Sequence, residues 1–391
     1  MSKQPSWVDS EEALHAAAQE AIGCDDFGDP GYLEGLRVLL EAYDREARLT
    51  DLGRAMLEGM LVAILKNRLR AEKLWRENPE ILDLEIRAPI FILGLPRTGT
   101  TALHVLLGQD PGIQVLEYWL AAAAQPRPPH EEWGAHPDHQ AAVAELDIMY
   151  TLDPSLKAVH LMTADGAEEC RHLLAQSFAE DTFDCNATIP SYSAWYEQTD
   201  ILPAYERHRD LLKLIGANQP EQRWILKYPK HLRDLDAIFE VYPDACIVQT
   251  HRDPAKVMPS ICSLLMGWRG LAEHDLDAEA IGRWQNELWA SRMESAMDAR
   301  ARRKPSQFFD LSFGEVVADP VGAVRRIYDH FGLAMNDESE RRLRSWHEAN
   351  PKGKHGEHRY DIGDFGLSET DVLDRYARYI EHFGVEREGS G

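Results

Sequence analysis

The chain has 391 residues, of which 44% are hydrophobic and 28% are charged, and its formal net charge at pH 7 is −24. This composition is typical of a folded globular protein and excludes wholesale disorder. At roughly 150 residues per domain, the length allows two or three units, or one large α/β domain with insertions. The negative charge disfavours nucleic acid and anionic lipid as main partners. An anionic ligand therefore requires a local cluster of donors.

The sequence carries no sign of membrane insertion or secretion. Apolar runs such as 60–65 and 118–124 are too short to span a bilayer, and residues 1–12 lack the basic and apolar segments of a signal peptide. The five cysteines include no pair at CxxC spacing, which argues against a disulfide framework or a zinc ribbon. We therefore predict a cytoplasmic protein.

The N-terminal region, residues 1–87, is predicted to be helical. Apolar residues recur at i, i+3 and i+4 within 32–40 and 56–65, with few helix breakers. We expect this region to pack as a helical layer on a main domain formed by residues 88–391.

The rest of the chain alternates between short apolar strands and helices. Four stretches are predicted as buried strands: 89–93, 223–227, 245–250 and 307–311. Helical stretches such as 232–241 and 281–300 separate them, and this alternation predicts a parallel sheet covered on both faces. Residues 118–222 lack the strand rhythm and are rich in aromatic residues. We expect them to form a helical insertion over the carboxyl edge of the sheet, where open α/β sheets bind ligands.

A glycine-containing loop, Gly94-Leu95-Pro96-Arg97-Thr98-Gly99-Thr100-Thr101, joins the first predicted strand to a helical stretch. Such a loop presents backbone N–H groups and the positive end of a helix to an anion. The spacing is that of a nucleotide P-loop, but Thr100 stands where the Walker lysine belongs. A P-loop kinase needs that lysine and a carboxylate for magnesium, and neither is evident. A kinase with a degenerate P-loop and a non-catalytic nucleotide-binding module remain the alternatives.

The residues Pro96-Arg97-Thr98-Gly99-Thr100-Thr101 resemble the first motif of the bacterial sulfotransferases that use 3′-phosphoadenosine 5′-phosphosulfate (PAPS). A second block, Thr250–Pro254 with Ser260 eight positions after Arg252, resembles the 3′-phosphate site of that family. The stretches 225–231 and 350–367 also resemble it, in the expected order. The resemblance spans about residues 88–383. It implies an α/β, P-loop-NTPase-like three-layer fold with a central parallel sheet.

The resemblance also implies a set of donor-binding residues. In the family the first loop holds the 5′-phosphosulfate, here through Arg97, Thr98, Gly99, Thr100 and Thr101. Arg252 and Ser260 would bind the 3′-phosphate, because a guanidinium offers a fork of donors to phosphate. A late basic loop with Lys352, Gly353 and Lys354 would close over it. Cytosolic relatives place a tryptophan where this chain has Ala102, so the adenine contact must come from elsewhere.

Sulfuryl transfer needs a base for the acceptor hydroxyl and cations for the transferring group. Glu117 stands where many relatives have a glutamate base, and partial burial would raise its pKa toward a useful range. His231 is the rival base, although it lies farther from Lys227 than the histidine of cytosolic relatives lies from their lysine. Lys227 and Arg97 are expected to stabilise the bridging oxygen and the sulfuryl group.

The sequence thus predicts an enzyme that moves the sulfuryl group of PAPS to a hydroxyl of a small molecule and releases 3′-phosphoadenosine 5′-phosphate (PAP). No metal is expected, because protein cations neutralise the leaving group. The aromatic residues of 118–222 favour a hydrophobic or aromatic acceptor, while a sugar hydroxyl remains open because aromatic rings also stack on sugars. A homodimer is compatible with the sequence.

Overall fold

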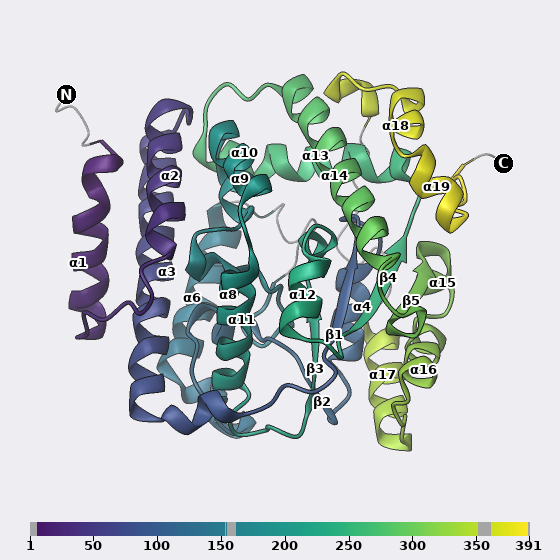
Figure 1. The fold of residues 1–391 in the computed structure, drawn as a ribbon, viewed down its shortest axis with the longest axis horizontal. Coiled ribbons are helices and arrows are strands. Elements are labelled where there is room, and N and C mark those ends of the chain that lie inside the picture. The colour runs from purple at the N-terminus through teal and green to yellow at the C-terminus, as the bar shows by residue number, and fades with distance from the viewer. Residues whose placement is uncertain (1–5, 153, 155–161, 351–360, 390–391) are drawn as a thin grey trace.

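The computed structural model describes residues 6–152, 154, 162–350 and 361–389, and its central element is a parallel sheet (Figure 1). In the described residues the sheet has five strands in the order β2-β3-β1-β4-β5. They are β1 (Ile90–Gly94), β2 (Ile113–Gln114), β3 (Arg223–Lys227), β4 (Cys246–His251) and β5 (Phe308–Ser312). All neighbouring pairs are parallel, which confirms the predicted α/β fold with a central parallel sheet.

The four strands predicted from apolar runs are present within one residue of the expected bounds. The fifth, β2, was not predicted. It contains only two residues, Ile113 and Gln114, which pair with Arg223 and Trp224 of β3. A strand this short carries no periodicity, and only its neighbour in the fold defines it.

The sheet separates two hydrophobic cores, because successive strand residues point to opposite faces. On β1, Phe91 and Leu93 join one core, whereas Ile90 and Ile92 join the other. The first core contains side chains of α11 (Leu202–Ile215), α12 (Leu235–Val241) and α14 (Ala278–Arg300). The second contains side chains of α4 (Thr100–Leu107), α16 (Pro320–Phe331) and α17 (Asp337–Ala349). Helices therefore cover both faces, and the fold has three layers.

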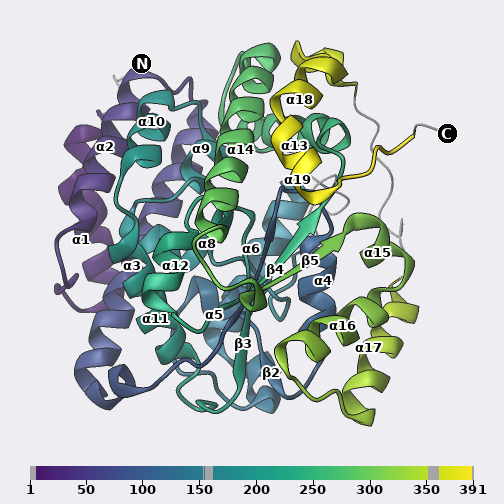
Figure 2. The ribbon, with the colours of Figure 1, turned by 45° about the vertical axis from the view of Figure 1, so that its right-hand side comes forward.

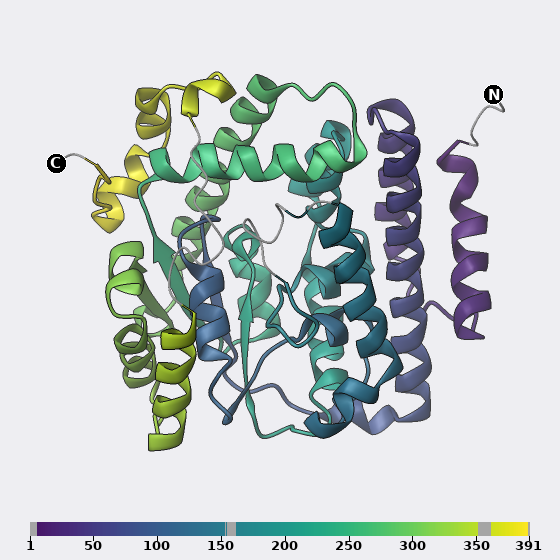
Figure 3. The same cartoon turned by 180° about the vertical axis from the view of Figure 1, so that it is seen from behind.

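The N-terminal helices form the side of the molecule farthest from β5 (Figures 1 and 3). They are α1 (Glu11–Ile22), α2 (Tyr32–Arg45) and α3 (Asp51–Glu77). The amide of Asn67 on α3 donates to the carbonyl oxygen of Ala121 and accepts from the N–H of Ala124, both at 2.8 Å. These two hydrogen bonds connect the N-terminal layer to α5 and to the turn just after it, and not to the sheet.

The described part of residues 118–222 contains helices and no strand. The helices before α11 are α5 (Tyr118–Ala122), α6 (Pro137–Leu152), α8 (Arg171–Leu174), α9 (Thr182–Asn186) and α10 (Pro190–Gln198). Between α6 and α8, the chain passes the carboxyl end of β3, where the N–H of Cys170 donates to the carbonyl oxygen of Lys227. This passage brings part of the region to the edge where the glycine loop lies.

The C-terminal helices return to the same edge of the sheet, above β4 and β5 (Figure 2). They include α13 (Pro254–Ala272), α18 (Glu369–Arg375) and α19 (Ala377–Phe383), whereas α15 (Phe313–Ala318) directly follows β5 and lies beside it. The ring of Phe383 stacks on His251 at the end of β4, with 4.2 Å between the ring centroids. All five cysteines are free. No helix in the described ranges has both the length and the apolarity needed to cross a bilayer.

Candidate active site

The glycine loop begins where β1 ends, and its backbone allows few other residues. Gly94 has φ 147°, and a Cβ there would lie 2.5 Å from the carbonyl oxygen of Thr250 on β4. The hydroxyl of Thr98 donates to the carbonyl oxygen of Leu95 at 2.6 Å and lies 2.6 Å from the hydroxyl oxygen of Thr250. The Thr98 side chain is thus buried, and its hydroxyl group bonds within the loop and against Thr250.

Helix α4 starts directly from this loop. Gly99 is its N-cap, with φ 92°, and no side chain in the described residues caps the first turn. Such a terminus combines N–H donors with the positive end of the helix dipole, which favours an anion. Arg97 is exposed and has φ 68°, a conformation that costs a non-glycine residue about 1–3 kcal/mol. The loop therefore has the strain and the donors of a phosphate-binding loop.

Lys227 connects this loop to a carboxylate. It is the last residue of β3, pairs with Ile92 of β1 and is 1% exposed. Its Nζ donates to the hydroxyl oxygen of Thr101 at 3.1 Å and to Oε1 of Glu169 at 2.5 Å. A buried cation therefore stands at the N-terminus of α4. Glu169 was not among the residues predicted from the sequence.

Glu117 is a buried carboxylate, held by one arginine. Its Oε2 accepts from Nη2 and Nε of Arg127 at 2.8 and 3.2 Å. Burial raises the pKa of Glu117, and the Arg127 charge opposes that rise. Arg127 also donates to the side chains of Gln114 and Gln219 and to the carbonyl oxygen of Val115. The pair joins the segment after α5 to β2.

His231 lies in the core on the α11 and α12 side of the sheet and is fully buried. Its Nδ1 is 2.6 Å from the hydroxyl oxygen of Tyr205, and its ring lies edge-on against Phe91. Burial lowers its pKa well below the ordinary value for histidine. An acceptor hydroxyl does not reach this side chain without displacing core residues.

Two of the residues predicted to bind the 3′-phosphate, Arg252 and Ser260, lie beside the loop. Arg252 follows β4, and its Nη1 donates to the carbonyl oxygen of Arg97 at 2.9 Å. The Nε of Arg97 donates in turn to the hydroxyl oxygen of Ser260 on α13 at 3.2 Å. The guanidinium of Arg252 lies 3.9 Å from the ring centroid of Phe313, the first residue of α15. The sequence did not single out Phe313, although it lies two residues after the predicted strand 307–311 at the same edge.

A carboxylate from the C-terminal segment occupies the fork of Arg252. Its Nε and Nη2 donate to the two carboxylate oxygens of Glu388 at 2.7 and 3.0 Å. Asp253 anchors this segment, because its Oδ2 accepts from the N–H of Glu388 and from Nε of Arg387. A bidentate carboxylate uses the same donors as a phosphate. No sequence motif marks Glu388, so this contact appears only in the fold.

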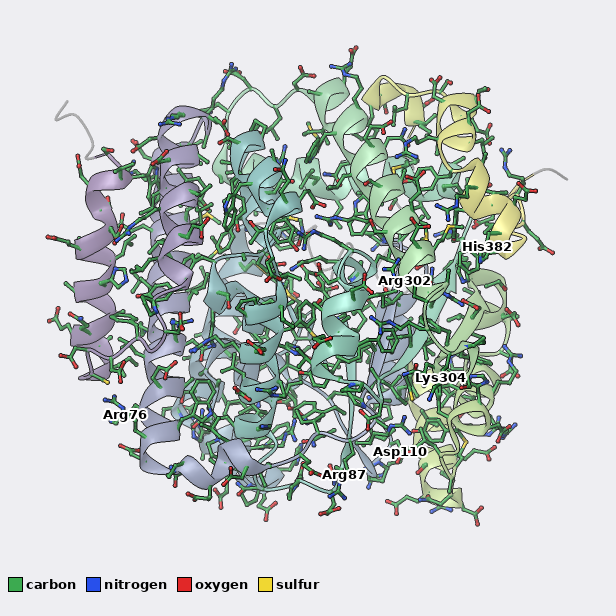
Figure 4. The ribbon with its side chains drawn as sticks, in the orientation of Figure 1. Arg76, Arg87, Asp110, Arg302, Lys304 and His382 are labelled. Carbon is green, nitrogen blue, oxygen red and sulfur yellow. The ribbon has the colours of Figure 1, made fainter. Side chains whose placement is uncertain are left out.

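Other predicted or charged groups lie outside this cluster. Lys352, Gly353 and Lys354 lie outside the described residues. Asp110 is buried but accepts from Tyr328 and Ser339 at the amino edge of the sheet, and Figure 4 shows it far from His382 of α19. Within the described ranges, no group of three or more His, Cys, Asp or Glu residues has a geometry that could hold a metal ion.

Comparisons with known proteins agree on one family. The model of the Sulfotransferase family matches residues 89–337. The chain is 40% identical to the crystal structure of sulfotransferase STF1 from Mycobacterium tuberculosis H37Rv, with 96% of this chain and 100% of that chain covered and a TM-score of 0.87. Sulfotransferase STF9 from Mycobacterium avium is 26% identical, with 97% and 98% covered and a TM-score of 0.90.

A curated relative has a more specific name. It is the omega-hydroxy-beta-dihydromenaquinone-9 sulfotransferase Stf3 of Mycobacterium bovis, which is 25% identical to this chain over 314 residues. The match covers 76% of each of the two chains.

Proposed function

Because the chain belongs to the sulfotransferase family, we propose that the loop of residues 94–101 binds the 5′-phosphosulfate of PAPS and presents its sulfuryl group to a hydroxyl. The chain is a PAPS-dependent sulfotransferase. The main support for this site is the hydrogen bond from the buried Lys227 ammonium to Thr101. It lies at a helix terminus that no described side chain caps.

At the 5′ end, the loop amides and Thr100 would hold the phosphosulfate. The exposed Arg97 and the ammonium of Lys227 would face the sulfuryl group and the bridging oxygen. Fixed cations at these positions stabilise the charge that develops on the leaving phosphate. In this proposal the cations that neutralise the leaving phosphate are protein side chains.

At the 3′ end, Arg252 and Ser260 would bind the 3′-phosphate, with Lys352, Gly353 and Lys354 closing over it. Support comes from the short chain of hydrogen bonds from Arg252 through Arg97 to Ser260. The ring of Phe313, against the Arg252 guanidinium, offers a stacking surface for adenine that the position of Ala102 does not.

The base would be a glutamate at the carboxyl edge of β3. The candidates are Glu117, which the sequence predicts, and Glu169, which contacts Lys227 at the end of β3. An antiparallel bridge pairs Glu117 with Ala167, two residues before Glu169. His231 is buried in the core, so we propose no proton transfer through its side chain.

The acceptor we propose is a hydroxylated hydrophobic molecule with an isoprenoid or quinone-like body. The aromatic side chains of 118–222 support this less than the sequence suggested, because Trp119, Phe178 and Phe183 are fully buried in the core. Support comes instead from the named substrate of the Stf3 relative. The acceptor-binding role of residues 118–222, a cytoplasmic location and a homodimer stay predictions.

The proposal is tested by incubating the protein with PAPS and a panel of phenols, steroids, hydroxylated isoprenoids and sugars. PAP release and the sulfated product are measured by mass spectrometry. We expect product with a hydrophobic alcohol and much less with Lys227→Met, which keeps the bulk of the side chain but not its charge. Absence of PAP with every acceptor, or magnesium-dependent consumption of ATP instead, would favour the kinase or binding-module alternative.

A further inference from the structure

The carboxylates of Glu117 and Glu169 are the two candidate bases, and they differ in the cation that each one contacts. Glu117 faces Arg127, whose five N–H donors are directed at Glu117, Gln114, Gln219 and the Val115 carbonyl. Its side chain is 10% exposed. The guanidinium that holds Glu117 is itself only 4% exposed and is bonded to β2 and to Gln219, whereas the bonds of Glu169 lead to Lys227 and Thr101.

Glu169 instead contacts the group that is expected to meet the donor. Its Oε1 accepts from Nζ of Lys227, which also donates to the hydroxyl of Thr101 on the first turn of α4. The Glu169 side chain is 16% exposed, whereas that of Lys227 is 1% exposed. Glu169 is therefore the more open member of a pair that touches the phosphosulfate loop.

The backbone fixes Glu169 at this position. The N–H of Glu168 donates to the carbonyl oxygen of Leu116 at 2.7 Å, and the N–H of Cys170 donates to the carbonyl oxygen of Lys227 at 3.2 Å. These two bonds hold the residue between them against the ends of β2 and β3. The Glu168 side chain is buried, and its Oε1 lies 3.4 Å from Nε of Arg171, which is also 3.9 Å from Oε2 of Glu169. Of these two adjacent glutamates, Glu169 accepts from the lysine.

We propose that Glu169, rather than Glu117, is the general base of the transfer; the assignment rests on the proposed function. When the sulfuryl group of PAPS enters, the Lys227 ammonium turns from Glu169 to the bridging oxygen of the donor. The carboxylate then faces the acceptor hydroxyl. The acceptor oxygen forms a bond to sulfur, and the bond between sulfur and the bridging oxygen breaks. The electron pair of that bond stays on the 5′-phosphate of PAP, and the hydroxyl proton moves to Glu169.

The test compares Glu169→Gln with Glu117→Gln and with Glu131→Gln, which replaces an exposed glutamate of η3 (His130–Ala135). For each variant, thermal unfolding, PAP affinity by calorimetry and kcat with PAPS are measured. General-base catalysis contributes about 10²- to 10⁴-fold. We therefore expect Glu169→Gln to lower kcat by at least about 100-fold at unchanged PAP affinity. Glu131→Gln should match the wild type, and Glu117→Gln should mainly lower the unfolding temperature.

A second measurement separates proton transfer from a structural role. The acid limb of the wild-type pH profile of kcat should be absent in Glu169→Gln, and added formate should restore turnover to Glu169→Ala. Normal kcat in Glu169→Gln, or loss of turnover in a folded Glu117→Gln that still binds PAP, would overturn the assignment. If the wild type binds no PAP, the proposed function fails and the assignment fails with it.

Discussion

The two ends of the proposed nucleotide site differ in how far they are formed in the free protein. At the 5′ end, Gly94 and Thr98 hold the loop in place through contacts with its own backbone and with Thr250. At the 3′ end, the donor fork of Arg252 already contains the carboxylate of Glu388. The 5′ end is thus preorganised, whereas the 3′ end must exchange an internal anion for a ligand phosphate. Variants at the 5′ end should change stability, and variants at the 3′ end should change affinity.

The largest effect is expected from Gly94→Ala. The added Cβ would lie 2.5 Å from a backbone oxygen, at a φ that disfavours side chains. Strain and overpacking together should lower the free energy of unfolding by about 3 kcal/mol, measured by urea denaturation. Gly59→Ala is the matched control, because Gly59 is an exposed residue of α3 with open space around its Cβ position. That variant should be stabilised by about 0.5–1 kcal/mol. Equal stability of the two variants would contradict a rigid 5′ end.

A smaller effect, confined to affinity, is expected from Arg252→Ala. Hydrogen bonds to a charged group contribute about 1.5–3 kcal/mol, so PAP affinity should fall roughly 10- to 100-fold. The affinity for adenosine 5′-phosphosulfate, which lacks the 3′-phosphate, should change little. Calorimetry with both ligands distinguishes these quantities. Equal weakening of both would show that Arg252 shapes the loop through the Arg97 carbonyl instead of binding the 3′-phosphate.

The smallest effect is expected from Glu388→Gln. The amide keeps the shape of the side chain but removes the charge that competes with phosphate. A partly exposed ion pair contributes about 0.2–1 kcal/mol, so PAP affinity should rise by up to about five-fold. Glu386→Gln, two residues earlier in the same segment, should leave the affinity at the wild-type value. A decrease in PAP affinity on Glu388→Gln would show that the C-terminal carboxylate supports the site instead of competing for it.

The sequence predicts local features of this molecule better than features that only the fold creates. The buried strands and the glycine loop are predicted from runs of adjacent residues. Arg252 lies just after a predicted strand and Ser260 lies eight residues later, so one short stretch of sequence contains both. Glu169 lies 58 residues from Lys227 in the chain, and an antiparallel bridge outside the sheet brings it there. No periodicity signals such a contact.

His231 and Glu388 show that a sequence motif does not determine whether a side chain reaches the site. His231 follows a lysine in a suggestive motif, yet its packing against Phe91 places it in the core. Glu388 has no motif, yet the return of α19 to the carboxyl edge of the sheet places it against Arg252. Motif position predicts which strand end carries a residue, whereas the direction of its side chain depends on packing.

We expect this site to bind a nucleotide through both its 5′ and 3′ phosphates. The most direct test is calorimetric titration of the wild-type protein, without magnesium, with PAP, adenosine 5′-phosphosulfate and ATP. Selective, tighter binding of PAP is the predicted result. Equal binding of ATP, or no binding of PAP, would contradict it.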